Sequence, residues 1–232
     1  MPFVYGIDTS YLIYVLPALI FALIAQAMVK STFAKYAKIP SDGRMTGRDA
    51  ARLILDANGL YHVAVTEVAG ELTDHFDPKA NVIRLSQSVY GVSSAAAVGV
   101  AAHEAGHAVQ YAEKYLPMKI RSAIIPATNI GSNLAVPLVL LGILFSIPAI
   151  SYLGVIFFGA AVVFQLVTLP VEFNASRRAI NGLKASGRVS DTGLAAVKKV
   201  LTAAAMTYVA ALATALGNML RLMSLANRSR RR

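Results

Sequence analysis

Four long apolar runs constrain this chain more than any other feature of its sequence. They cover residues 10–29, 124–147, 150–171 and 200–220, and none of them contains a charged side chain. A helix of about 20 mostly apolar residues is long enough to cross the hydrocarbon core of a bilayer. The whole chain is 56% hydrophobic and 15% charged, whereas a soluble domain is typically about 25% charged. We therefore expect a mainly α-helical, multi-pass membrane protein.

The charges beside these runs predict an orientation in the membrane. Asp8 is the only charged residue before the first run, and a series of basic residues from Lys30 to Arg52 follows it. Arg177 and Arg178 follow the third run in the same way. Because Lys and Arg concentrate in cytoplasmic loops, we expect the N-terminus outside the cell. The segments after the first and third runs are then cytoplasmic.

The last apolar run allows two interpretations. A fourth span would place the arginines near the C-terminal end of the chain outside, against the charge rule. Polar side chains also recur along this part of the chain at helical spacing, namely Thr207, Thr214, Asn218 and Arg221. We therefore prefer three spans followed by an amphipathic helix at the membrane interface, with four spans as the alternative.

Cysteine content and net charge narrow the chemistry. The chain has no cysteine, so a metal ion would be held by His, Asp, Glu and water alone. The net charge is +10, but the arginines are scattered and no nucleic-acid recognition module is visible. We therefore expect contact with anionic lipids of the bilayer rather than binding to nucleic acid.

Two histidines one helical turn apart form the strongest chemical signal. His103, Glu104 and His107 lie in the stretch His-Glu-Ala-Gly-His. Residues four apart stack on one helix face, so both imidazoles can bind one Zn²⁺. Glu104 is rotated by about 100° from His103, where it can take a proton from a metal-activated water and pass it to the leaving amine. The alternatives are a chance match and a solvated helix face, and the small apolar residues around the motif disfavour the latter.

The third ligand can be sought by elimination. The positions three and six residues after His107 hold Gln110 and Glu113, so the helix offers no third histidine there. Glu113 shares the helix but points away from the histidine face. Glu172, at the end of the third apolar run, is the carboxylate that we choose, because an acidic group at a membrane boundary usually has a specific partner.

Other assignments remain open for this ligand. Asp191, His75 and His62 are the alternative ligands. Glu172 could instead form a plain interfacial ion pair with Arg177 or Arg178.

The segment between the first two runs is predicted to mix helix and strand. Thr46 is a candidate N-cap for a helix over residues 48–57, residues 61–67 alternate as a strand does, and a helix over residues 95–113 carries the motif. A further strand precedes that helix, formed by Val82, Ile83, Arg84, Leu85 and Ser86. In zinc-dependent peptidases with this local order, an edge strand pairs with extended substrate. We assign that role to the second strand, with a plain sheet strand as the alternative.

Three stretches together resemble the YugP-type membrane zinc metallopeptidases of bacteria. They are His-Glu-Ala-Gly-His-Ala-Val-Gln, His-Phe-Asp-Pro with the later Val-Ile-Arg-Leu-Ser, and Leu-Pro-Val-Glu-Phe-Asn-Ala-Ser-Arg-Arg-Ala. The resemblance covers nearly the whole chain, including the order of the spans. It implies a neutral zinc peptidase related to the gluzincins, whose third ligand is a downstream Glu, in agreement with Glu172.

The chain departs from this pattern at two positions. The resemblance leads us to expect Asp where Asn174 stands, and the broader membrane gluzincins often have Asp where Ser176 stands. We assign Asn174, Ser176 and His75 to the surroundings of the ligands or to the substrate side, because groups behind the ligands orient them.

These inferences divide the chain into four parts. Residues 1–30 form an N-terminal membrane anchor, and residues 31–122 form a small α+β, zincin-like cytoplasmic region. Residues 123–172 form a hairpin of two spans that ends in the third ligand. Residues 173–232 form a membrane-associated helical region.

The expected function is that of a membrane-embedded zinc endopeptidase with one Zn²⁺ per chain. Its site would face the cytoplasm at the boundary of a bacterial cell membrane and act on peptides or membrane-protein segments. Two alternatives are a protease that cleaves within the bilayer and a non-catalytic scaffold with a relic zinc site. The sequence indicates no oligomeric state.

Overall fold

The computed structural model describes residues 3–4, 7–71 and 73–230. The chain forms two compact units, and four long helices contribute residues to both, namely α1 (Leu16–Tyr36), α4 (Leu116–Leu144), α5 (Pro148–Ala185) and α6 (Asp191–Arg230). Unit 1 consists of Met1–Gln26, Lys119–Leu169 and Thr207–Arg232. Unit 2 consists of Ala27–Met118 and Pro170–Met206.

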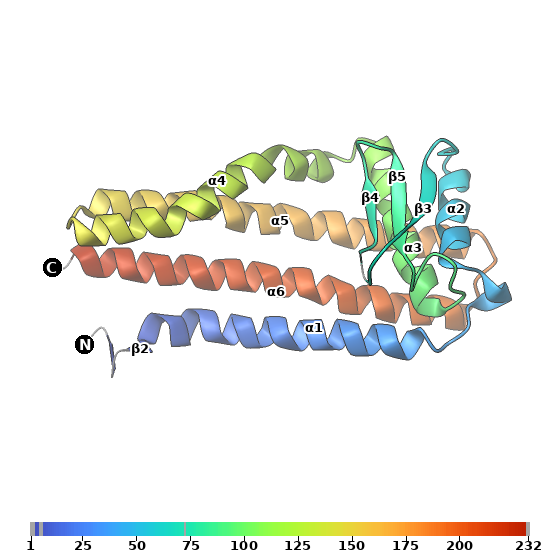
Figure 1. Cartoon of the computed structure of the whole chain (residues 1–232), viewed down its shortest axis with the longest axis horizontal. Coiled ribbons are helices and arrows are strands. Elements are labelled where there is room, and N and C mark those ends of the chain that lie inside the picture. The colour runs from blue at the N-terminus through green and yellow to red at the C-terminus, as the bar shows by residue number, and fades with distance from the viewer. Residues whose placement is uncertain (1–2, 5–6, 72, 231–232) are drawn as a thin grey trace. The chain divides into compact units, whose positions relative to one another are not determined.

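Helices dominate the chain, as the apolar runs predict. In chain order the elements are β1 (Phe3–Val4), β2 (Ile7–Asp8), η1 (Tyr11–Val15), α1 (Leu16–Tyr36), η2 (Asp42–Arg44), α2 (Gly47–Ala57), β3 (Ala64–Val68), β4 (His75–Asp77), β5 (Val82–Ser86), α3 (Ala95–Ala112), α4 (Leu116–Leu144), α5 (Pro148–Ala185) and α6 (Asp191–Arg230) (Figure 1). The helix and the two strands expected before the motif helix, and the motif helix itself, lie within a few residues of their predicted bounds as α2, β3, β5 and α3.

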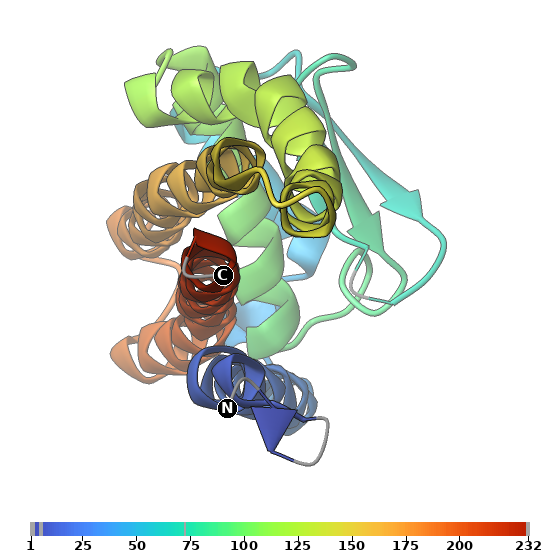
Figure 2. The same cartoon turned by 90° about the vertical axis from the view of Figure 1, so that its left-hand side faces the viewer.

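Unit 1 contains most of the apolar helical surface. Helices α4 and α5 form the expected hairpin, joined by the short segment 145–147 (Figure 2). Small residues let the two helices approach closely, since a Cβ added at Gly154 would lie 2.6 Å from the carbonyl oxygen of Ala135. Such contacts are typical of helices packed in a bilayer, where close van der Waals contact replaces the hydrophobic effect.

Four helices in the described part of the chain are long and apolar enough to cross a membrane. They are Tyr11–Tyr36, Leu116–Leu144, Pro148–Ala185 and Asp191–Asn227. The number of candidate spans is therefore one more than the three spans that we preferred from the sequence. How many of them cross the membrane, and in which direction, stays a prediction.

The polar stripe of α6 is compatible with a span for a local reason. The hydroxyl of Thr214 donates to the carbonyl of Ala210, and the amide of Asn218 donates to the carbonyl of Thr214. These polar groups are therefore satisfied within their own helix. A hydrogen-bonded side chain costs less in hydrocarbon than a free one.

Unit 2 packs two helices against a three-stranded sheet. The strand order is β3-β5-β4, with β5 parallel to β3 and antiparallel to β4. Helix α2 begins in a capping box, in which the Thr46 side chain accepts from the Asp49 N–H and the Asp49 carboxylate accepts from the Thr46 N–H. This reciprocal pair satisfies backbone donors that the first turn would leave free.

Strand β5 is the central strand of this sheet, which corrects one expectation. Val82, Ile83, Arg84, Leu85 and Ser86 pair with β3 on one side, and three of them pair with β4 on the other. Their backbone groups are committed within the sheet, so β5 cannot add an extended substrate as an edge strand. The plain sheet strand is the correct interpretation.

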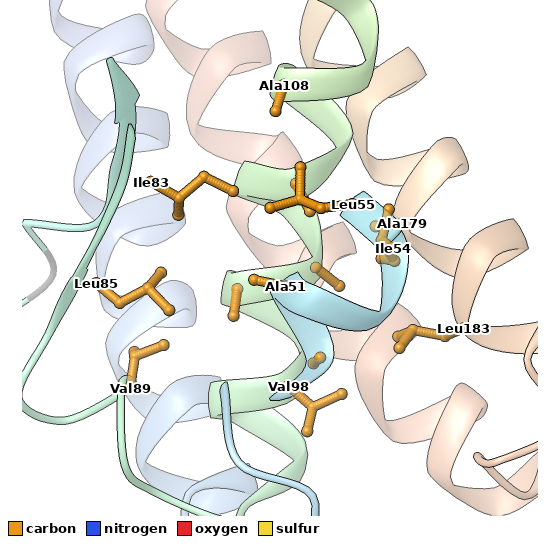
Figure 3. Packing of buried hydrophobic residues seen from close by; sticks show 14 of the residues in the cluster. Ala51, Ile54, Leu55, Ile83, Leu85, Val89, Val98, Ala108, Ala179 and Leu183 are labelled. Atoms are coloured by element: carbon orange, nitrogen blue, oxygen red, sulfur yellow. The ribbon is translucent and has the colours of Figure 1, made fainter. Parts of the chain in front are cut away.

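The core of unit 2 lies between the sheet and the helices α2, α3, α5 and α6. Ile83 and Leu85 project from β5 toward α2 and α3, and Ala179 and Leu183 of α5 approach from another side (Figure 3). All four of these side chains are fully buried. This packing fixes α3 against α5, and the two helices carry the predicted ligands.

Candidate metal centre

Helix α3 places two imidazoles on one face. The Ser94 hydroxyl caps the helix by accepting from the Ala97 N–H at 3.2 Å, and small side chains let nearly all of the helix be buried. The rings of His103 and His107 lie edge to face with centroids 4.6 Å apart. Their side chains are 14% and 11% exposed, so both sit in a largely dry environment.

Glu172 of α5 lies against both histidines. Its Oε2 atom is 3.2 Å from Nε2 of His103 and 3.4 Å from Nε2 of His107, and its side chain is 3% exposed. The three ligand atoms lie within 4.8 Å of one another and could hold a metal ion. Among the residues that the structure describes, this is the one group of three or more side chains that could hold a metal ion. Asp191, His62 and His75 do not belong to it.

The spacing of these atoms fits Zn²⁺. Zinc binds His nitrogen and carboxylate oxygen at about 2.0–2.2 Å with tetrahedral geometry. Two ligand atoms on such an ion are therefore about 3.3–3.6 Å apart, close to the two observed distances. Two neutral imidazoles and one carboxylate are also a donor set that catalytic zinc sites use, with a fourth position left for water.

Glu104 lies on the same helix but outside the group of three. It is 9% exposed, and its Oε2 atom accepts from the backbone N–H of Phe76 on β4 at 2.9 Å. This bond commits one carboxylate oxygen to β4. Glu104 is thus held beside the candidate ligands by a strand distant in sequence.

Comparison with known proteins decides the family. Residues 11–227 match the family described as "Putative neutral zinc metallopeptidase". The chain belongs to this family. It is also 48% identical over 197 residues to the "Putative membrane protease YugP" of Bacillus subtilis (strain 168). The aligned region covers 85% of this chain and 88% of that protein. No solved structure matches the chain.

The motif-based resemblance is thereby confirmed. The name of the relative and the four apolar helices agree that this zinc metallopeptidase family member is a membrane protein.

A buried glutamine organises the groups behind the candidate ligands. Gln110 is fully buried, and its Oε1 atom lies 3.0 Å from Nδ1 of His107. Its amide nitrogen donates to the carbonyl of Val171 at 2.8 Å and to Oδ1 of Asn174 at 2.9 Å. Because an amide oxygen can only accept, Nδ1 of His107 carries the proton and Nε2 has its lone pair free for a metal.

Gln110 was given no role in the sequence-based prediction. One signal was present, because a polar side chain one turn after His107 interrupts an otherwise small and apolar helix.

Asn174 and Ser176 lie in the predicted surroundings of the ligands. Oδ1 of Asn174 accepts from Gln110 and, at 2.7 Å, from Nε of Arg178. The hydroxyl of Ser176 is 3.2 Å from Nδ1 of His103. These two uncharged groups stand where the family pattern led us to expect Asp, and each contacts a side chain that in turn supports or forms the group of three.

Arg178, one of the two arginines considered as partners of Glu172, pairs with a different carboxylate in the structure. Arg178 forms an ion pair with Glu113 at 2.6 Å, and this arginine holds the pKa of the Glu113 carboxyl below its usual range. Glu113 points away from the histidines, as the helix geometry predicts, and it ties the end of α3 to α5.

His75 lies on β4 and not among the candidate ligands. Its side chain is exposed, and its Nδ1 atom lies 2.7 Å from the carbonyl oxygen of Thr73.

The residue before it, Asp74, was not singled out from the sequence. Asp74 accepts from the N–H of Ser86 at 2.7 Å and from the Ser86 hydroxyl, and its partial burial raises the pKa of its carboxyl. These bonds fix the start of β4 against the end of β5.

Gly106 allows α3 and α5 to meet at the candidate centre. A Cβ added there would lie 2.5 Å from the carbonyl oxygen of Ala175. Any larger residue would push apart the two helices that carry His103, His107 and Glu172. Hence this glycine is required by a close approach of two backbones.

Proposed function

We propose that the chain is a membrane-embedded, zinc-dependent endopeptidase that holds one Zn²⁺ through His103, His107 and Glu172. The observation that carries the proposal is the convergence of these three donors, from two helices, at distances of 3.2 and 3.4 Å. Membership of the zinc metallopeptidase family supports the choice of metal and reaction.

Each protein group then has a defined task. The ion, when bound, supplies a nucleophile at neutral pH because it lowers the pKa of water. Glu104 takes the proton from the attacking water and delivers it to the leaving amine, which is general acid–base catalysis. The hydrogen bond from Phe76 to Oε2 orients the carboxylate and leaves Oε1 available for proton transfer. Gln110 keeps the Nδ1 proton on His107 and so keeps Nε2 basic.

The sheet suggests where an extended substrate would lie. Because β5 is central, only β3 and β4 have a free edge in this sheet. Of these, β4 contacts Glu104 through its backbone. We therefore transfer the substrate-pairing role from β5 to the outer edge of β4, where main-chain bonds would hold the peptide beside the general base.

The site is proposed to face the cytoplasm at the membrane boundary. Glu172 directly follows the apolar run of α5, and basic residues begin five positions later. Peptides and membrane-protein segments near the surface are the substrates that such a location favours. Cleavage within the bilayer is less favoured, because α3 is not among the four membrane-spanning candidates in the described part of the chain.

A paired zinc and activity measurement tests this function. Glu104→Gln keeps an oxygen that can accept from the Phe76 N–H, so the variant should fold and bind zinc. Hydrolysis of a casein-like substrate should fall by about 10²- to 10⁴-fold, which is the usual contribution of a general base. Glu113→Gln is the matched control at the C-terminal cap of the same helix, and it should retain activity. Hydrolysis by Glu104→Gln at the wild-type rate would refute the mechanism. An inactive wild type would instead favour the non-catalytic scaffold.

A further inference from the structure

A groove of about 360 Å³ lies between α5 and α6 within unit 2. Its walls include Phe173, Arg177 and Ile180 from α5 and Lys198, Thr202 and Met206 from α6. These residues recur every three or four positions, so each set forms one face of its helix. We refer to this cavity as the α5–α6 groove.

The groove has two basic side chains and no acidic one. Arg177 and Lys198 are both exposed. Within the residues that the structure describes, neither of them forms an ion pair with a carboxylate. Arg178, one position after Arg177, is by contrast neutralised by Glu113. The groove therefore offers two positive charges to an external anion.

The opposite end of the groove is apolar. Phe173 is 45% exposed although it is a large aromatic residue, and Leu201 and Ala205 form a buried floor. The short segment 186–190 connects α5 and α6, which run in opposite directions (Figure 1). Phe173 and Met206 thus lie toward the apolar runs of both helices, and Lys198 lies toward their charged ends.

We propose that the α5–α6 groove binds an anionic phospholipid. The phosphate lies between Arg177 and Lys198, and the acyl chains extend along Phe173 and Met206. Charge complementarity selects an anion, and the adjoining apolar half selects one that carries hydrocarbon rather than a free phosphate. The boundary between apolar run and charged segment is also the depth at which headgroups lie.

This lipid site adjoins the candidate metal centre. Ser176 lines the groove and hydrogen-bonds to His103. A lipid in the groove would thus touch the helix turn that supports the first histidine. The proposal does not require peptidase activity, because lipid binding can be measured without any turnover.

Native mass spectrometry of the detergent-purified full chain tests the proposal. Phosphatidylglycerol and phosphatidylcholine are titrated separately, and the bound lipid is counted. The variant Arg177→Gln/Lys198→Gln removes both groove charges. The control variant Lys184→Gln/Arg188→Gln removes two exposed charges from the same part of the chain outside the groove.

The wild type should bind phosphatidylglycerol more tightly than phosphatidylcholine. Each basic residue near an anionic lipid contributes about fivefold in affinity, so the groove variant should lose about 25-fold and the control less than about threefold. Equal losses in the two variants, or no loss in the groove variant, would overturn the proposal.

Competition distinguishes the source of the anion. Lysophosphatidylglycerol should displace the bound lipid, whereas millimolar inorganic phosphate should not. Displacement by phosphate alone would show that the groove takes a free anion and would contradict the lipid assignment. Preferential displacement by an acidic peptide would contradict it in favour of a peptide-binding groove.

Discussion

Replacing Gly106 by alanine should damage zinc binding while leaving the helix itself more stable. The new Cβ would lie 2.5 Å from the carbonyl oxygen of Ala175. A separation of 3.0 Å requires a shift of about 0.5 Å, and ordinary van der Waals contact at 3.4 Å requires about 0.9 Å. Zinc–ligand distances tolerate only about 0.2 Å. The helices α3 and α5 therefore cannot satisfy both the new methyl group and the metal.

The expected loss of affinity follows from the cost of overpacking. Inserting a methyl group into a packed interface costs about 1–3 kcal/mol. If loss of the ion lets the helices separate and relieves this strain, zinc affinity falls by about 5- to 150-fold. Competition with a chelator measures the affinity, elemental analysis gives the zinc content per chain, and peptide hydrolysis should fall in parallel.

Gly99→Ala is the matched control on the same helix. A Cβ there would lie 3.5 Å from the nearest atom, a methyl carbon of Val197, which is ordinary contact. Both substitutions gain about 1 kcal/mol of helix propensity, so only the contact with α5 differs. Equal zinc affinity in the two variants would refute the close-approach argument.

Three further predictions concern the residues around the centre. Gln110→Ala should lower zinc affinity about 10- to 100-fold, because His107 loses its acceptor, and chelator competition measures the change; wild-type affinity would contradict the role of Gln110. Glu172→Ala should remove most of the bound zinc, and full occupancy in elemental analysis would show that another residue is the ligand. Asp74→Asn should stabilise the protein more at pH 7 than at pH 4 in thermal unfolding, and a difference independent of pH would contradict this.

The sign of the Asp74 prediction follows from its raised pKa. A carboxyl whose pKa is higher in the folded state contributes stability that is present below its unfolded pKa of about 3.9. That contribution is lost as the pH rises through the raised folded pKa. Asparagine carries no such charge, so the variant avoids the loss while its side-chain oxygen can still accept from Ser86.

The candidate ligands could be predicted because few residues are eligible. The chain has four histidines and no cysteine, and helical spacing alone pairs His103 with His107. Elimination among the downstream carboxylates then leads to Glu172, and the structure brings it to both histidines. Scarcity of alternatives made a contact between residues 69 positions apart accessible from sequence.

The position of β5 could not be predicted in the same way, because strand order depends on pairing between distant segments. Its burial on both faces, with only Arg84 partly exposed, is typical of a central strand. The continuous Val-Ile at its start was a weak signal of this. The partners of Gln110 could not be predicted either, because Val171 and Asn174 belong to another helix and no sequence rule brings them to α3.

Whether α6 crosses the membrane stays a prediction, because only its length and composition make it a candidate span. The polar stripe of α6 suggested an interfacial helix, but a sequence pattern does not show that Thr214 and Asn218 bond to their own backbone.

X-ray absorption spectroscopy at the zinc edge on the wild-type chain tests the central claim most directly. The proposed centre predicts one zinc per chain, bound by two imidazole nitrogens and by oxygen donors at about 2.0–2.2 Å. The Glu172→Ala variant should lose this spectrum together with the metal. A site with three imidazoles, which would require His62 or His75, or a wild-type chain that binds no zinc, would contradict the account.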